Sequence, residues 1–270
     1  MSIGGATFTE GGFDSSTAAV AAANNIWKIF GPYTSSVSRP FGTSAVDGFD
    51  FDYESGVQNM IPFGQELRRL MNADKASTGK QWLLTVAPQC VFPDSANGAM
   101  LDGQVFFDIV FIQFYNNWCG VQNFGNPNAW NYDVWHNWAK TRSLNPNVKL
   151  MIGVPGGPGA AGSGYIDSTA LAKVIQYGKG YDTFAGIMMW DASRVWQNSG
   201  FLNSAAANLG LPPTTTMVTS TRTSTTVVGP TDGSGTIPQW GQCGGDGWTG
   251  TGTCMAPWTC VGSQWWKQCQ

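Results

Sequence analysis

Residues 47–54 read DGFDFDYE, and this stretch decides the fold that we expect, because it places four acids within eight positions of a chain that has only 17. Successive side chains of a β-strand point to opposite faces of the sheet. A strand therefore gathers the acids on one face and the aromatic residues on the other, whereas a helix would mix them. The acids are Asp50, Asp52 and Glu54, and the aromatic residues are Phe49, Phe51 and Tyr53. Because aromatic residues also favour strands, we predict a strand with its acids at the C-terminal end.

Apolar, strand-like runs recur along the chain and alternate with segments of helical spacing, such as Leu67, Leu70 and Met71. The expected strands are residues 46–52, 82–87, 108–114, 149–154 and 184–190, with residues 2–5 as the end of another. Such alternation is typical of βα units around a parallel sheet. Six strands in about 210 residues fall short of the eight strands and about 250 residues of a typical barrel. We therefore expect an α/β fold, a (β/α)8 TIM barrel that lacks its first two βα units, with an N-terminal piece missing.

Composition limits the partners. Charged residues make up only 11% of the chain and the net charge is −3, so no basic surface is available for nucleic acid. The 13 tryptophans among many uncharged polar residues suit sugars, which stack on aromatic faces. The sequence contains no apolar run of about 18 residues and therefore predicts no membrane span. The six cysteines form an even set and indicate an oxidising, extracellular location, although no signal peptide opens the chain.

Three carboxyl groups on one strand face lie about 7 Å apart, so they cannot all ionise freely and at least one keeps its proton to unusually high pH. A protonated carboxyl near neutrality can cleave a glycosidic bond. A calcium loop would start at Asp50, but its sixth position is Ser55 instead of Gly and its twelfth is Ile61 instead of Glu. A purely structural acidic turn is the other alternative, and such a turn would not alternate with bulky aromatic residues.

The octet resembles the DxxDxDxE signature of family 18 glycoside hydrolases. Four further motifs follow the order found in the plant and fungal hevamine-like chitinases. They are SIGG at residues 2–5, LTVAPQC at 84–90, FIQFYNN at 111–117 and GIMMWDAS at 186–193. The resemblance covers residues 1–210, which we expect to form the catalytic domain.

The resemblance implies an endo-chitinase that cuts β-1,4 bonds between N-acetylglucosamine units by substrate-assisted, retaining catalysis, without metal or cofactor. Glu54 would be the general acid and then the base, Asp52 would bond the acetamido nitrogen, and Asp50 would share a proton with Asp52. Gln113 and Tyr115 would orient the acetamido group. The resemblance also implies that Trp190 forms the floor under the sugar before the cleavage point and that Cys90 pairs with Cys119.

Two other functions stay open. A barrel without its first strands could be a catalytically inactive protein that binds chitin or cellulose. The same acid strand could instead cleave the chitobiose core of N-glycans, as an endo-β-N-acetylglucosaminidase.

Residues 211–238 are rich in Thr, Ser and Pro and hold too few large apolar residues to pack a core, so we expect a linker, either disordered or also O-glycosylated. Residues 239–270 then hold four cysteines. They contain neither a CxxC pair nor a histidine, which favours disulfides over a zinc site.

This C-terminal segment resembles the fungal family 1 carbohydrate-binding modules, which stack a flat strip of aromatic side chains on a polysaccharide surface. The resemblance implies that Cys243 pairs with Cys260 and that Cys254 pairs with Cys269. It also assigns the surface of cellulose or chitin to four residues, Trp240, Trp265, Trp266 and Gln268. We expect the whole chain to be a monomer.

Overall fold

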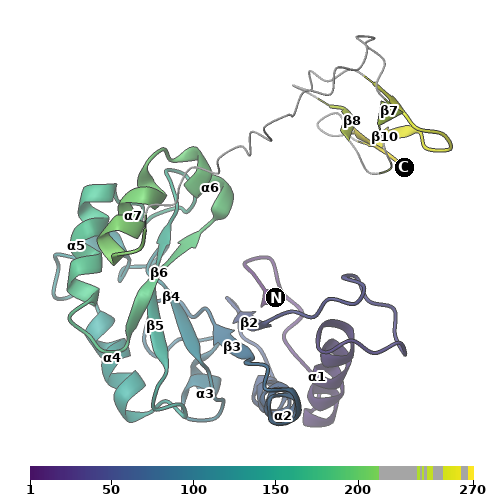
Figure 1. Ribbon diagram of the computed structural model, residues 1–270. Coiled ribbons are helices and arrows are strands. Elements are labelled where there is room, and N and C mark those ends of the chain that lie inside the picture. The colour runs from purple at the N-terminus through teal and green to yellow at the C-terminus, as the bar shows by residue number, and fades with distance from the viewer. Residues whose placement is uncertain (213–235, 238, 240–241, 246–251, 263–266) are drawn as a thin grey trace. The chain divides into compact units, whose positions relative to one another are not determined.

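The computed structural model describes residues 1–212, 236–237, 239, 242–245, 252–262 and 267–270 (Figure 1). The chain divides into two compact units, Met1–Thr215 and Thr216–Gln270. Among the described residues, no helix combines the length and the apolar character that crossing a membrane requires.

The first unit is built on a parallel sheet whose six strands lie in chain order. The strands are β1 (Ser2–Gly4), β2 (Gly48–Asp52), β3 (Leu83–Val86), β4 (Ile109–Gln113), β5 (Lys149–Pro155) and β6 (Phe184–Trp190). Each predicted strand is present, and the ends differ from the prediction by two residues at most. The α/β class and the six-strand count are therefore confirmed. Within the described part of the chain, β1 and β6 form the two edges of this sheet.

Helices connect consecutive strands and follow the outer side of the sheet (Figure 1). They are α1 (Ser16–Phe30), α2 (Met60–Thr78), α3 (Gly98–Leu101), α4 (Tyr132–Thr141) and α5 (Ser168–Gly178), with the short 3-10 helix η1 (Val121–Asn123) before α4. After β6 come α6 (Ala192–Gln197) and α7 (Phe201–Leu209). The strand–helix alternation explains the parallel pairing, because each crossover returns the chain to the same end of the sheet.

The hydrophobic core lies between the sheet and these helices. Phe51 of β2 is fully buried, and its ring packs 5.5 Å from Phe63 of α2 and 5.9 Å from Phe107, centre to centre. Leu67 and Met71 continue the buried stripe of α2, one turn apart. Burying such side chains contributes about 1.5–3 kcal/mol each, so this packing holds β2 in place.

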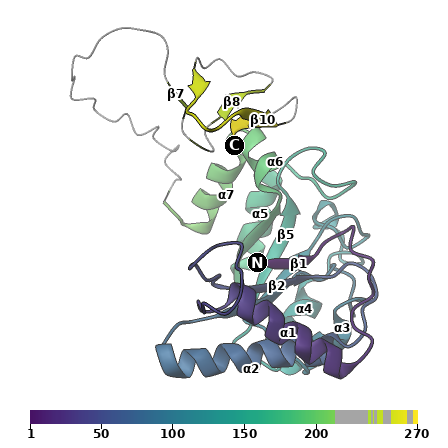
Figure 2. The ribbon, with the colours of Figure 1, turned by 90° about the vertical axis from the view of Figure 1, so that its right-hand side faces the viewer.

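The C-terminal ends of parallel strands meet at one edge of the sheet, where βα proteins place their functional residues. Figure 2 shows the sheet and its helices from a second side. Three segments follow this edge: the end of β2 with the acids, the end of β4 with Gln113, and the end of β6 with Trp190. A glycine-rich segment, residues 153–164, begins in β5 and also leaves from this edge.

The second unit contains short strands. β8 (Gln242–Gly244), β10 (Cys260–Gly262) and β11 (Lys267–Cys269) form an antiparallel sheet in the order β10-β11-β8, and β7 (Thr236–Ile237) pairs with β9 (Thr253–Cys254). Disulfide bonds join Cys243 to Cys260 and Cys254 to Cys269. A unit this small buries little apolar surface, so the two cross-links supply much of its stability.

Candidate active site

The acid strand alternates as the sequence predicts. Phe49, Phe51 and Tyr53 are at most 2% exposed on the helix side of β2. Asp50, Asp52 and Glu54 are only partly buried. Asp47 stands apart at the start of the strand, where its side chain is 94% exposed and lies 3.5 Å from Nζ of Lys80. The strand thus separates packing from polar chemistry.

Asp50 is held from both neighbouring strands. Its Oδ2 accepts a 2.7 Å hydrogen bond from Oγ of Ser2 on β1, and its Oδ1 accepts a 2.6 Å bond from Oγ1 of Thr85 on β3. Both donors are the register partners of Asp50 in the parallel ladders. Neither Ser2 nor Thr85 was predicted from the sequence, although Thr85 is the one polar residue in the run LLTV of β3.

Asp52 lies between Asp50 and Glu54 on the polar face. Its pKa is raised to about 6, chiefly because burial disfavours the charged carboxylate, and further because Glu54 and then Asp50 repel it. Gln113 opposes this rise by donating a 2.9 Å hydrogen bond from Nε2 to Oδ1 of Asp52. Asp52 can therefore be protonated in mildly acidic solution, where an ordinary aspartate is charged.

Burial also raises the pKa of Glu54, which follows the end of β2. The nearby amide of Gln113 lowers this pKa, while the charge of Asp94 adds to the rise. The charge of Glu54 in turn contributes to the raised pKa of Asp52. A carboxyl that stays protonated beside an ionisable neighbour can act as a general acid.

Tyr115, two residues beyond Gln113, is 7% exposed. Its pKa is raised by burial first and then by the charges of Asp52 and Glu54, which places the phenol near both acids and keeps it a hydrogen-bond donor. Gly164, in the loop after β5, packs directly against it. A Cβ at Gly164 would lie 2.6 Å from Cβ of Tyr115, and its φ of +107° also disfavours any other residue.

Trp190 ends β6 and is 50% exposed. It pairs in register with Pro155 at the end of β5, on the edge of the sheet where β2 also ends. An indole that is half exposed at a strand end can stack on a sugar ring. In the described part of the molecule, no hydrogen bond joins Trp190 to the acids, so its place under a sugar stays a prediction.

The loop between β3 and α3 brings in residues that the sequence analysis did not single out. Asp94 and Asn97 are 6% and 0% exposed. Cys90 of the same loop forms a disulfide with Cys119 in the loop after β4, and both cysteines are fully buried. The spacing of DSAN at residues 94–97 is typical of an Asx turn, which was the only signal for Asp94.

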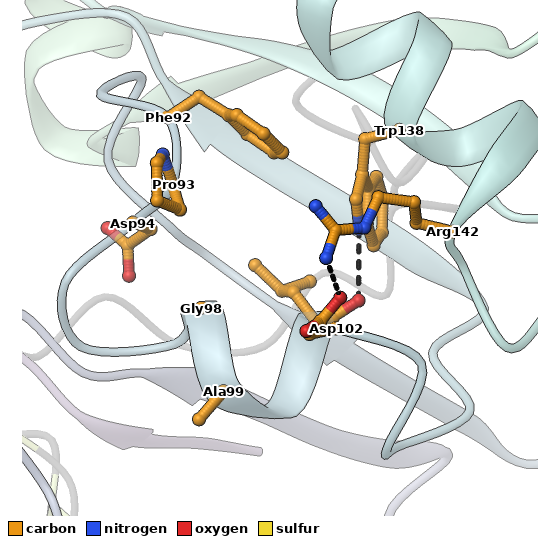
Figure 3. A pocket seen from close by; sticks show the side chains of 9 residues that line it. Phe92, Pro93, Asp94, Gly98, Ala99, Asp102, Trp138 and Arg142 are labelled. Atoms are coloured by element: carbon orange, nitrogen blue, oxygen red, sulfur yellow. Dashed lines mark hydrogen bonds and ion pairs between the residues drawn. The ribbon is translucent and has the colours of Figure 1, made fainter.

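A cavity of about 360 Å³ lies on the other side of this loop, beside α3 and α4 (Figure 3). Phe92, Pro93, Trp138 and the ion pair between Arg142 and Asp102 line it. None of the three strand acids lines this cavity. It is therefore separate from the acid row, and Asp94 is the residue at which the two regions meet.

Most of the predicted polysaccharide-binding residues of the second unit, Trp240, Trp265 and Trp266, lie outside the described residues. Gln268 lies on β11 opposite Val261. The sulfur atoms of Cys243, Cys254 and Cys269 lie within 4.8 Å of one another, but each is engaged in a disulfide and cannot ligate a metal.

Each of the two units is similar to a known protein family. The model of glycosyl hydrolases family 18 matches residues 1–158, and that of the fungal cellulose binding domain matches residues 239–266. The class III chitinase of Arthroderma benhamiae is 49% identical over 216 residues, which cover 77% of this chain and 64% of that protein. Endochitinase 33 of Trichoderma harzianum is 50% identical over 207 residues, which cover 74% of this chain and 63% of that protein.

Among solved structures, the xylanase and α-amylase inhibitor protein XAIP-II of Scadoxus multiflorus superposes with a TM-score of 0.63 at 33% identity. The match covers 78% of this chain and 73% of that one. The chain spans less than two thirds of the length of the two fungal relatives. With a family match over more than half of its residues and relatives near 50% identity, the chain belongs to family 18 of the glycosyl hydrolases.

Proposed function

We propose that the chain is an endo-acting chitinase, which hydrolyses β-1,4 bonds of N-acetylglucosamine polymers. The observation that carries the proposal is the polar face of β2, where Gln113 bonds Asp52 and the pKa values of Asp52 and Glu54 are both raised. Two fungal relatives named chitinase and endochitinase support the same activity.

In the first step, Glu54 donates its proton to the bridging oxygen while the bond from that oxygen to the anomeric carbon breaks. The acetamido oxygen of the same sugar attacks the anomeric carbon and forms an oxazolinium ion. Asp52 accepts a hydrogen bond from the acetamido N–H and stabilises the positive charge, and Tyr115 and Gln113 orient the group. Substrate assistance of this kind is the known exception to the scheme with two carboxylates.

In the second step, the Glu54 carboxylate takes a proton from water, and the water oxygen bonds to the anomeric carbon as the oxazolinium ring opens. The two displacements return the anomeric carbon to its first configuration. Glu54 regains the proton that it gave, so the cycle needs no metal or cofactor. Asp50, whose oxygens accept bonds from Ser2 and Thr85, would act through its charge on Asp52.

We also propose how the chain meets its substrate. Residues 239–270 would bind the surface of chitin or cellulose through Trp240, Trp265, Trp266 and Gln268, and the match to the fungal cellulose binding domain supports this role. Residues 211–238 would tether them to the hydrolase of residues 1–210, which raises the local substrate concentration. A polysaccharide of this kind is too large to enter a cell, so the chain would be secreted. It would act there as a monomer.

A second candidate function is sugar binding without hydrolysis. It is favoured by the likeness to XAIP-II, which is named an inhibitor and not an enzyme. Such a protein would bind chitin through both regions and release no sugar.

The deciding experiment compares Glu54→Gln with Glu66→Gln. Glu66 lies on α2, where it pairs with Arg69 away from the acid strand. Sugar released from chitin and from a chito-oligosaccharide is measured beside pull-down on chitin. The chitinase proposal expects Glu54→Gln to abolish release and keep binding, with Glu66→Gln active.

Wild-type binding without release would favour the second candidate. Release from an N-glycoprotein but not from chitin would identify an endo-β-N-acetylglucosaminidase. Activity retained by Glu54→Gln would overturn the catalytic assignment.

A further inference from the structure

Asn97 holds the backbone of the acid strand from a distant part of the chain. Its Nδ2 donates a 2.9 Å hydrogen bond to the carbonyl oxygen of Tyr53, which lies 44 residues earlier. That carbonyl belongs to the peptide bond that joins Tyr53 to Glu54. Because Asn97 is fully buried, water cannot replace this bond without opening the structure. The contact therefore fixes the point from which the Glu54 side chain departs.

Asp94 in turn holds Asn97. Its Oδ1 accepts bonds from the backbone N–H of Ala96 at 3.1 Å and from the backbone N–H and Nδ2 of Asn97 at 2.6 Å and 3.0 Å. Its Oδ2 accepts a 3.0 Å bond from the backbone N–H of Gln89. Four N–H donors on one buried carboxyl order the loop from Gln89 to Asn97.

The same loop also supports Gln113. The backbone N–H of Gln113 donates to the carbonyl of Pro88 at 2.8 Å, and the N–H of Cys90 donates to the carbonyl of Gln113 at 3.1 Å. One ordered segment thus contacts the backbone next to Glu54 and the backbone of the residue that bonds Asp52. Neither contact involves a side chain of the acid strand.

We propose that Asp94 and Asn97 are positioning residues for Glu54: Asp94 orders the loop through its four N–H donors, and Asn97 fixes the peptide that carries Glu54. The inference rests on the proposed role of Glu54 as the acid. The charge of Asp94 also supports Glu54 in a second way. It raises the pKa of Glu54 and so helps Glu54 to keep its proton.

Several ionisable groups surround Glu54. Asp52 precedes it on the same face and interacts with it, Tyr115 follows β4, and Asp94 lies in the loop after β3, while Asp50 acts on Asp52. Asp94 is the acid among them that belongs to neither β2 nor the end of β4. Replacing it leaves the row of strand acids intact, so a change in the Glu54 titration would come from Asp94, through its charge and through the loop that it orders.

The structure offers a matched control in the lining of the same cavity. Figure 3 shows Asp102 paired with Arg142 across the cavity from Asp94. Asp102 is more than half exposed, and its carboxyl pairs with Arg142 of α4's C-terminal end, away from the acid strand. Asp102→Asn therefore removes the same charge as Asp94→Asn without touching the loop that reaches Tyr53.

The test reads the protonation of Glu54 directly. The chain has three glutamates, Glu10, Glu54 and Glu66, so carboxyl ¹³C-labelled glutamate gives three resonances, and the one lost in Glu54→Gln is assigned to Glu54. We expect Asp94→Asn to move the titration of Glu54 to lower pH and Asp102→Asn to leave it in place. The high-pH limb of kcat on a chito-oligosaccharide should shift in the same direction.

For Asn97→Leu we expect kcat to fall about 10-fold or more, with KM within about twofold, because the acid is misplaced and sugar binding is kept. A loss of folded protein alone would lower kcat in proportion to the folded fraction, which thermal unfolding measures. If a variant does not fold, Asn97→Ser, whose side chain is too short to reach Tyr53, gives the same readouts.

The inference is overturned if folded Asp94→Asn leaves the Glu54 titration unchanged and folded Asn97→Leu keeps the wild-type kcat. A wild type without activity on the oligosaccharide would refute the proposed function instead. In that case the resonance of Glu54 still reports whether Asp94 acts on it.

Discussion

Gln113 donates a 2.9 Å hydrogen bond from Nε2 to Oδ1 of Asp52, and the same nitrogen donates at 2.8 Å to the carbonyl oxygen of Ala87. Gln113 is 4% exposed, so the amide is fixed by its surroundings before it meets the carboxyl. Asp52 is thereby oriented by a side chain 61 residues away in the sequence. β2 supplies the acid, and Gln113 of β4, two strands away in the sheet, orients it.

Gln113→Leu should therefore lower kcat on a chito-oligosaccharide by about 10- to 100-fold, since a positioned donor is lost. It should also raise the pKa of Asp52 further, because the bond from Gln113 now lowers it. A pH–rate profile of kcat measures both effects. Gln65→Leu is the control, since Gln65 is exposed on α2 and donates to the carbonyl of Gln104. Equal losses in both variants would mean that the bond to Asp52 has no special role.

The raised pKa of Asp52 predicts how stability varies with pH. Its folded value of about 6 lies above its unfolded value, so the folded state binds more protons between pH 4 and 6. The stabilisation that the Asp52 proton gives is fully present below the unfolded pKa, and it is lost as pH rises through the folded pKa. After allowance for solvent screening at this partly exposed group, the loss is about 1 kcal/mol.

Asp52→Asn should remove this loss, so the variant should gain stability over wild type at pH 7 and not at pH 4. Urea unfolding at the two pH values measures the difference. An equal gain in stability at both pH values would mean that the gain comes from packing and not from the proton of Asp52.

The disulfide between Cys90 and Cys119 links the loops that follow β3 and β4 across 29 residues of sequence. By loop-closure entropy, replacing both cysteines with Ala should lower the free energy of unfolding by about 3–4 kcal/mol. Calorimetry of the first unit measures this loss. Cys243→Ala with Cys260→Ala is the comparison, because these cysteines lie in the other compact unit. If both double variants lowered the unfolding transition of the first unit by a similar amount, the Cys90–Cys119 disulfide would have no specific effect on that unit.

Substitutions at Gly164 and Gly159 distinguish the effect of backbone strain from the effect of contact with Tyr115. Both have positive φ, +107° and +74°, but only Gly164 would place a Cβ against Tyr115, while Gly159 has no neighbour within 4 Å. Gly159→Ala should cost about 1 kcal/mol through strain alone. Gly164→Ala should cost about 3 kcal/mol and also lower kcat, because Tyr115 must move. Chemical denaturation measures the two losses of stability, and an oligosaccharide assay measures kcat. If the Gly159→Ala and Gly164→Ala variants had equal kcat values, Tyr115 would have no role in catalysis.

Local pattern was enough to predict the strand of acids. The alternation of acid and aromatic residues in 47–54 depends only on the period of a β-strand, and Phe51 and Tyr53 are buried as that period requires. The six strands could be located for the same reason, because apolar runs and helical spacing are properties of short windows. The side chains that these patterns do not contain were harder to foresee.

Thr85 and Asn97 illustrate what a sequence pattern does not reveal. Thr85 meets Asp50 because of a register between two strands, which is set by the whole βα unit between them. Asn97 meets the carbonyl of Tyr53 because a loop after β3 turns back over the end of β2. Neither contact leaves a periodic signal. The two residues become visible only when elements far apart in the chain lie side by side.

The division of β2 into an aromatic face and an acidic face also bears on evolution. Side chains that hold the sheet to its helices, such as Phe51, are not the ones that would carry out hydrolysis. Under the proposed mechanism, mutations at Asp52 or Glu54 would therefore abolish turnover while the protein still folds. A lineage built on this scaffold can lose its chemistry in one step, survive as a stable protein, and be selected afterwards for an unrelated task.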